Sequence, residues 1–405
     1  MSDRGQQKSM AADDIRKQAD VRKADKKSAV ETPLTQCDPP LAGREPQFLN
    51  IDNSDLFQTL RRSMATKNFS VPEGDRWPAA DLNNASHHLK AIAQLKPDPT
   101  EVLPFLLDPG ISEWQERTNE YAICMDDLTA DVLDVISAEW LKQASHPESM
   151  VVLTADDILR HRGLNHKKGG SGRRGGYHNH QRREIARHID LLANTWIRVF
   201  ERTVTEIAEG KKGTYRKRTK WAGESRVVIV SNRVGPVNPS GDLEPRAWKI
   251  RPGDVFAQFL IGPGRQTALI SQKALHYDPY RQYWEKRITR FLAFLWRIRR
   301  GRKDYLAPIS VGALLQGAGL QVDKRNPKKS RGRMEKALNQ LSQDDVIRSW
   351  RYVPQVNGRP AGRKGWLETW VSWKVQIEPP QEIVEQYSKM NHNLAGKKAL
   401  PAPGK

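Results

Sequence analysis

Two stretches of the chain carry the same pattern of apolar and polar positions. VLTADDILRHRGL (152–164) and PISVGALLQGAGL (308–320) align without a gap, and the match pairs Thr154 with Ser310 at the start of a predicted helix. Hydroxyl side chains are favoured caps at such starts. In each stretch the following apolar positions recur at helical spacing, and a glycine stands where the helix should stop. A repeat of this kind predicts two copies of one structural unit.

The residues around the two stretches extend the repeat. A long helix with one apolar face is expected before each copy, over Leu128–Trp140 and over Tyr283–Arg299. After each copy come a basic loop, an amphipathic helix that opens on arginines, and a strand rich in β-branched and aromatic residues. This order is typical of a winged helix-turn-helix, which places a basic helix in a DNA major groove. We therefore predict an α+β, mainly helical fold with two tandem winged helix-turn-helix domains.

Each predicted domain ends in a two-stranded wing. In the first domain the wing covers roughly 196–233, with strands at Trp196–Ile207 and Arg226–Val230 joined by a basic turn. In the second domain, strands at Val346–Val353 and Leu367–Ile377 are joined by a loop rich in glycine and arginine. Flexible basic hairpin tips suit contacts with phosphates or with an adjacent minor groove.

Composition and helix breakers divide the rest of the chain. Residues 1–45 hold few large apolar residues, so we expect a disordered tail there. The next segment mixes two short helical pieces, Leu56–Met64 and His87–Leu95, with several prolines, and suggests a small lead-in domain or partner arm. The expected boundaries are 1–45 for the tail, 46–115 for the lead-in, 116–277 for the first winged-helix domain with a bridging insertion, 278–380 for the second, and 381–405 for a C-terminal tail.

The charge balance indicates a polyanionic partner. The chain of 405 residues has 67 Lys and Arg against 47 Asp and Glu, a formal net charge of +20. Its two cysteines, Cys37 and Cys124, exclude a disulfide scaffold and a cysteine-rich zinc finger. No apolar run approaches the roughly 20 residues that cross a bilayer, and no signal-peptide core is present. We expect a cytoplasmic protein that does not contact membranes.

The candidate DNA contacts are basic residues of the predicted recognition helices, loops and wings. Arginine suits bidentate contact with guanine, while lysine and serine suit phosphate oxygens. In the second domain the candidates are Lys324, Arg325, Lys328, Lys329, Ser330, Arg331, Arg333, Arg359, Arg363 and Lys364. In the first domain they are Lys167, Lys168, Arg173, Arg174, Arg182, Arg183, Arg216, Lys217 and Arg218. A solvated basic surface is the competing explanation, but the same placement in both copies favours DNA.

Catalytic chemistry finds little support in the sequence. His178-Asn179-His180 is similar to part of an HNH nuclease motif, but it opens a helix and lacks further ligands. No P-loop, no zinc-ligand spacing and no acidic triad occur. The helix Tyr283–Arg300 has an apolar face that suits a core. Its other face is basic and is expected to run along DNA, with Arg287, Arg290, Arg297, Arg299 and Arg300, and with Arg302 and Lys303 beyond the helix. We predict a protein that is not an enzyme and needs no cofactor.

The repeated arrangement over roughly 120–380, with stretches such as ISVGALLQGAGL and RMEKALNQLSQDDVIRSWRY, resembles the tandem winged-helix replication initiators of bacterial plasmids and integrative elements. The resemblance implies a protein that binds direct repeats in an origin with both domains, helps to open adjacent duplex and recruits host replication proteins. It also implies a homodimer formed through the first domain. The glycine-rich loops and the 234–277 insertion depart from that family. A winged-helix transcriptional regulator is one alternative, and an unrecognised nuclease, relaxase or recombinase is another.

Overall fold

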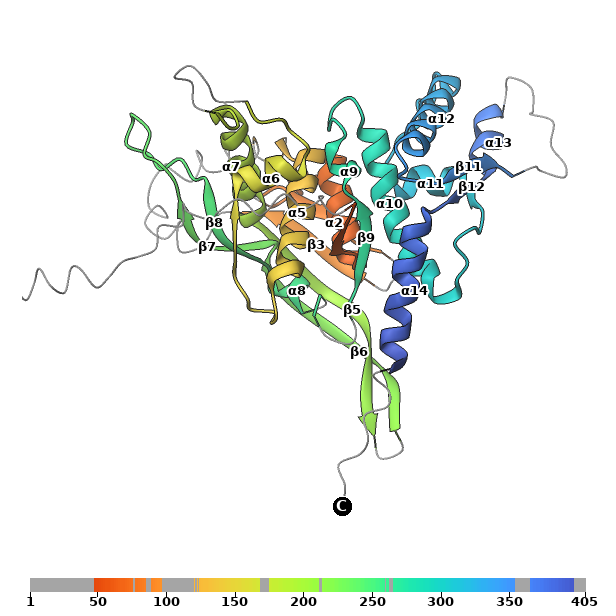
Figure 1. Cartoon of the computed structure of the whole chain (residues 1–405), viewed down its shortest axis with the longest axis horizontal. Helices are drawn as coiled ribbons and strands as arrows, with labels where there is room; N and C mark the ends of the chain where they lie inside the picture. The colour runs from red at the N-terminus through yellow and green to blue at the C-terminus, as the bar shows by residue number, and fades with distance from the viewer. Residues whose placement is uncertain are drawn as a thin grey trace, which may run out of the picture. The chain divides into compact units, whose positions relative to one another are not determined.

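The chain folds as a mixture of helices and small sheets (Figure 1). The computed structural model describes residues 47–75, 77–84, 89–96, 120, 122, 124–167, 175–210, 213–258, 260–261, 265–353 and 365–396. These residues belong to one compact unit, Pro46–Lys405, and the predicted tail 1–45 lies outside the described residues.

The elements follow one another in this order. The first part of the chain contains β1 (Phe48–Asp52), α2 (Asp55–Ala65), β2 (Ala79–Asp81), β3 (Leu89–Leu95), α5 (Asp127–Gln143), β4 (Val151–Thr154), α6 (Ala155–His161), α7 (Asn179–Ala193), β5 (Thr195–Gly210), β6 (Gly213–Arg226), β7 (Val228–Val234), β8 (Ala247–Pro252), α8 (Asp254–Ala257), β9 (Thr267–Ser271) and α9 (Lys273–His276). The second part contains α10 (Tyr283–Arg299), the 3-10 helix η3 (Arg300–Arg302), β10 (Ile309–Ser310), α11 (Val311–Gly317), α12 (Pro327–Gln343), β11 (Ser349–Tyr352), α13 (Trp366–Ser372), β12 (Lys374–Glu378) and α14 (Gln381–Gly396).

The two copies of the repeated pattern share their order of elements. The first copy runs from α5 to β8 and the second from α10 to β12. In each, three antiparallel strands form a sheet with the last strand in the middle, in the orders β4-β8-β7 and β10-β12-β11. Thr154 and Ser310 cap α6 and α11 as predicted: their side-chain oxygens accept hydrogen bonds from the N–H groups of Asp157 and Ala313, at 3.1 and 3.2 Å.

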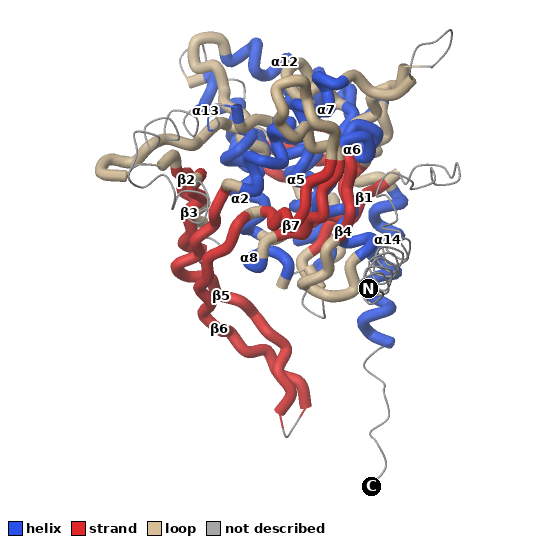
Figure 2. Tube along the Cα trace, turned by 90° about the vertical axis from the view of Figure 1, so that its left-hand side faces the viewer, coloured by secondary structure: helices blue, strands red, loops and turns tan. Residues whose placement is uncertain are grey.

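The first copy differs from the second by a long hairpin between α7 and β7. β5 pairs with β6 on one side and with β3 on the other, in the sheet β2-β3-β5-β6. Figure 2 shows the two long strands running together beyond the rest of that sheet. The wing predicted at roughly 196–233 is therefore wrong, because the basic stretch continues as strand β6, and β7 and β8 are the strands that join β4. The other partner of β5, strand β3, is about 100 residues away in the chain, and local patterns do not reveal such a pairing.

Two further local predictions need correction. His87–Leu95 was predicted as a helix but contains β3, whose positions alternate between buried and less buried, the period of a strand. Leu367–Ile377 was predicted as one strand but divides into α13 and β12. The cause is the spacing of its tryptophans: Trp366 stacks on Trp370 one helical turn later, and Trp370 is completely buried.

The strand predicted at Val346–Val353 is shorter than expected. Only Ser349–Tyr352 forms β11, which pairs with β12. Val346 and Ile347 come before the strand and are buried in an apolar cluster with α12 and α10. Their β-branched side chains therefore fill the core of the second copy without taking part in its sheet.

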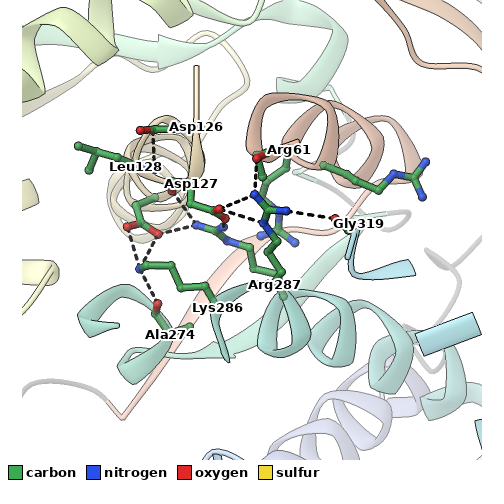
Figure 3. A network of polar contacts seen from close by, with 12 residues as sticks. Arg61, Asp126, Asp127, Leu128, Ala274, Lys286, Arg287 and Gly319 are labelled. Atoms are coloured by element: carbon green, nitrogen blue, oxygen red, sulfur yellow. Dashed lines mark hydrogen bonds and ion pairs between the residues drawn. The ribbon is translucent and has the colours of Figure 1, made fainter. Parts of the chain in front are cut away.

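A buried ionic network joins α2, α5 and α10 (Figure 3). Asp127, Asp131 and Asp134 share one face of α5, and Arg290 of α10 donates hydrogen bonds to all three, at 2.8, 2.5 and 3.0 Å. Lys286, which is completely buried, donates to Asp131 at 2.9 Å. The cations of this ionic network are Arg61, Arg162, Lys286, Arg287 and Arg290; Arg162 pairs with Asp131 at 3.6 Å. Arg61 brings in α2 through an ion pair with Asp134 at 2.6 Å.

The ionic network corrects the DNA-facing role predicted for α10. Arg290 is only 5% exposed, so it cannot lie along DNA. Arg287 donates to Asp127 at 2.9 Å and to the backbone oxygen of Gly319 at 3.1 Å. Asp127 lies in α5 of the first copy, and Gly319 follows α11 in the second copy. Arg287 therefore links these two segments. The charged face of α10 is largely an internal contact.

Asp52 is a buried acid whose pKa is altered. Its side chain is 1% exposed, and one carboxylate oxygen accepts a hydrogen bond from the N–H of Ser54 at 2.7 Å. The other oxygen is buried without a hydrogen-bond partner among the described residues. Burial raises the pKa of Asp52 from 3.8 to about 7. The folded state therefore keeps a proton that the unfolded chain loses, so stability from this group is present below pH 3.8 and is lost as pH rises through about 7.

Asp52→Asn should make the free energy of unfolding less dependent on pH. Asparagine cannot ionise, so the variant avoids the cost of burying a charge. Between acid and neutral solution it should gain on the wild type by roughly 3 kcal/mol, because each pH unit below the raised pKa of about 7 contributes about 1.4 kcal/mol. Urea unfolding of both proteins at pH 4.5 and pH 7.5 measures this gain. Two pH profiles that run parallel would show that Asp52 titrates normally.

Candidate nucleic-acid interface

The basic helix of the second copy, α12, starts at a turn that its own side chains hold. Asn326 caps the helix by accepting a hydrogen bond from the N–H of Lys329 at 3.2 Å, and Pro327 occupies the first helical position. Asp323 accepts hydrogen bonds from the N–H groups of Arg325 and Asn326 at 2.9 and 3.2 Å. These bonds fix the basic loop that precedes the helix.

α12 has one buried face and one exposed face. The buried face consists of Ser330, Met334, Ala337, Leu338 and Leu341. On the opposite side, at the helical period of about 3.6 residues, five residues are exposed, and we call them the outward line: Lys328, Gly332, Lys336, Asn339 and Gln343. Cationic and amide side chains on one helix face are the groups that contact phosphates and base edges.

Ser330 does not belong to this exposed face. Its side chain is 6% exposed, and its oxygen accepts a hydrogen bond from the N–H of Asp323 at 3.0 Å. The prediction that Ser330 contacts DNA is therefore wrong, because the hydroxyl group is used to attach the preceding loop to α12.

Arg331 and Arg333 lie on the two sides of the outward line. Arg331 donates to Glu335 at 2.7 Å, and its guanidinium lies 5.1 Å from the centroid of the Trp373 ring. Arg333 lies 4.6 Å from the centroid of the Tyr283 ring. A guanidinium stacked on an aromatic face is held in place while its outer edge stays available to an anion. The two arginines are thus fixed beside the helix.

The surface around the start of α12 carries cations without acidic partners. Lys324, Arg325, Lys328, Lys329 and Lys336 are all exposed and, among the residues that the structure describes, none of them forms an ion pair. Like charges held this close repel one another, so a bound polyanion would relieve the repulsion.

The corresponding helix of the first copy, α7, is neutralised by acids of the same chain. Arg182 donates to both carboxylate oxygens of Asp156 in α6, at 2.6 and 2.8 Å. Arg183 donates to Glu244, in the loop between β7 and β8, at 2.7 Å. The two predicted recognition helices therefore differ in the charge that they offer to DNA.

Several other predicted contacts lie beyond what the structure describes. Lys168, Arg173, Arg174, Arg359, Arg363 and Lys364 fall outside the described residues.

The structure places the backbone of four other predicted contacts. Arg216, Lys217 and Arg218 lie on β6, which pairs with β5, so they do not belong to the hairpin next to β4. Lys167 is exposed, and its backbone pairs with Gly176.

Four residues of the outward line, Gly332 among them, are absent from the DNA contacts predicted from the sequence. Lys336, Asn339 and Gln343 follow Gly332 at helical spacing and are exposed. Asn339 accepts a hydrogen bond from the indole N–H of Trp350 at 2.9 Å, which orients its amide. Continuing the helical period past the basic start of α12 would have found these residues.

The two histidines that suggested a nuclease motif stand at the start of α7, exposed, with ring centroids 5.0 Å apart. In the described part of the chain, no group of three or more His, Cys, Asp or Glu residues could hold a metal ion. The described helices also include none that is long and apolar enough to cross a membrane.

Comparison with known proteins gives distant structural likenesses. No protein-family model matches the chain, and no curated protein sequence matches it. One crystal structure of domains 2 and 3 of RctB covers 78% of this chain and 98% of its own, with 12% identity and a TM-score of 0.36. A second structure of RctB domains 2–3 covers 80% and 99%, with 14% identity and a TM-score of 0.34. These values are too low to carry an argument about function.

Proposed function

We propose that the chain is a sequence-specific double-stranded DNA-binding protein whose two copies are winged helix-turn-helix domains. The order of strands supports this assignment, since in both copies the last strand lies between the other two. The order of helices supports it as well, because a short capped helix precedes a longer basic one in each copy. A basic helix that packs beside a small sheet can enter a major groove while the hairpin contacts the backbone.

The exposed face of α12 is the observation that carries this proposal. Lys328 and Lys336 stand one turn to either side of Gly332, and the outward line ends in the amides Asn339 and Gln343. Lysines neutralise phosphates, and amide side chains pair with adenine edges. In this arrangement α12 reads the sequence, whereas α7, in which Arg182 and Arg183 are already paired with acids, contributes less binding energy.

The biological role that we propose is replication initiation for a plasmid or integrative element, without enzymatic activity. Two linked DNA-binding domains suit an origin with repeated sites, since linkage raises the effective concentration of the second domain once the first is bound. In this role the protein binds direct repeats and brings host replication proteins to them. The tandem arrangement of the copies is the feature that supports this role.

Selection from a random duplex library tests the proposal. The full chain should enrich a defined motif, and its affinity for that motif should fall by about 10³-fold between 50 and 200 mM salt, as for six or more phosphate contacts. If no motif is enriched, the proposal of sequence-specific binding is wrong.

The position of the motif in the source genome then tests the biological role. Direct repeats beside an AT-rich tract fit an initiator, and one inverted repeat over a promoter fits a regulator. Metal-dependent cleavage of the selected DNA would contradict a role without catalysis.

A further inference from the structure

Gly332 is an unusual residue for its position. It lies inside α12, on the outward line, opposite the buried residues Met334 and Leu341 around the helix. Glycine weakens the interior of a helix because it loses more backbone freedom than any other residue. An exposed glycine in such a place therefore needs a reason.

The rest of the described chain supplies no such reason. Gly332 has no positive φ, so its backbone does not require glycine. A Cβ built on Gly332 meets nothing within 4 Å outside its own helix. Gly317 and Gly319 behave differently: a Cβ on Gly317 would lie 2.1 Å from the Phe291 ring, and Gly319 has a φ of +66°. Their small size is explained within the fold, whereas that of Gly332 is not.

The surroundings of Gly332 indicate what occupies the space above it. Lys328 and Lys336 flank it along the helix, and Arg331 and Arg333 are held to its sides by stacking on Trp373 and Tyr283. The bare backbone is thus the lowest point of a cationic surface. A major groove about 12 Å wide is nearly filled by a helix with its side chains, so losing one side chain at the centre lets the helix lie deeper.

From these observations we infer that Gly332 is the point of closest approach between α12 and the base edges at the floor of a DNA major groove. The inference rests on the proposed DNA-binding function and names the residue that sets the depth of docking. Gly332 contributes by the absence of a side chain. Lys328 and Lys336 on either side reach groups that a shallower helix would leave out of range.

Gly332→Ala should make the protein more stable and its binding to the selected duplex weaker. Alanine should stabilise α12 and raise the midpoint of thermal unfolding by about 1–3 °C. The added methyl group should weaken binding to the selected duplex by about tenfold, while binding to a scrambled duplex changes less than about twofold. Gly332→Leu should weaken specific binding further, by about 100-fold. Fluorescence anisotropy with the full chain measures both duplexes, and calorimetry measures the midpoint.

Gly301→Ala is the matched control. Gly301 lies in η3, its φ is not positive, and a Cβ there also meets nothing within 4 Å. This variant should leave DNA binding unchanged.

The outcomes separate the proposed function from the inference about Gly332. A wild-type chain that selects no duplex would refute the proposed function itself. If the wild type binds its motif and Gly332→Ala binds it equally well, only the inference about Gly332 is wrong. Equal weakening on both duplexes would place Gly332 against the phosphate backbone and also overturn the inference.

Discussion

Replacing Asp131 with asparagine should lower the free energy of unfolding by about 3–5 kcal/mol, the usual cost of removing one partner from a buried ion pair. Asp131 is completely buried and accepts hydrogen bonds from Lys286 at 2.9 and 3.0 Å and from Arg290 at 2.5 Å. Without this carboxylate, the hydrogen bonds that the buried ammonium of Lys286 keeps with described residues are those to the backbone oxygens of Ala274 and Leu275. Urea denaturation of the wild type and the variant measures the loss.

A second substitution separates the ionic effect from a simple packing defect. Lys286→Met removes the cation that Asp131→Asn leaves unpaired, so in that background it should recover part of the lost stability, on the order of 1–3 kcal/mol. In the wild-type background the same substitution should be destabilising, because it leaves the carboxylate of Asp131 with one partner fewer. If Lys286→Met costs the same in both backgrounds, the two residues are not coupled and the role given to the ionic network is wrong.

The double substitution Lys328→Ala and Lys336→Ala should weaken binding to the selected duplex by roughly 2–4 kcal/mol, or about 30- to 1000-fold. Both lysines are exposed on the outward line, and neither forms an ion pair with a described residue, so their charge is available to DNA. The salt dependence should also become shallower, because fewer counterions are released on binding. Titrations at several salt concentrations measure both effects.

The controls for this prediction match the change in charge and compare the two helices. Lys142→Ala with Lys389→Ala removes two exposed lysines from α5 and α14, of which Lys142 lies 3.6 Å from Glu139, and should cost little specific affinity. Arg183→Ala in α7 should cost less than about 1 kcal/mol, because Glu244 already neutralises this arginine. Equal losses from the α12 double variant and the α5/α14 double variant would show that only net charge matters. A larger loss from Arg183→Ala would make α7 the main reading helix.

Local patterns predicted much of the helical structure. The apolar spacing over Leu128–Trp140 and Tyr283–Arg299 correctly indicated α5 and α10, and the hydroxyl caps at Thr154 and Ser310 lie where they were expected. These features depend on residues within one or two turns of each other. The patterns predict strands less well. They indicate a helix where β3 forms and a strand where α13 forms, because short apolar runs fit both periods.

In the candidate interface, too, some features were visible in the sequence and others depend on the fold. The basic start of α12 was visible in the sequence, and so was its likeness to the start of α7. The burial of Ser330 and the pairing of Arg182 with Asp156 were not visible, since each depends on a neighbour brought close by the fold. A basic residue in a sequence has a known charge but an unknown partner.

The sequence by itself determined the duplication, the caps and faces of the main helices, and the excess of positive charge, because each of these is a property of residue types and short spacings. Only the tertiary structure decided which cations are free. It buried Arg290 among three aspartates of α5, paired Arg183 with Glu244, and left Lys328 and Lys336 exposed. The physical reason is that an ion pair forms between segments far apart in the chain, and its effect on a surface appears only when both partners are in place.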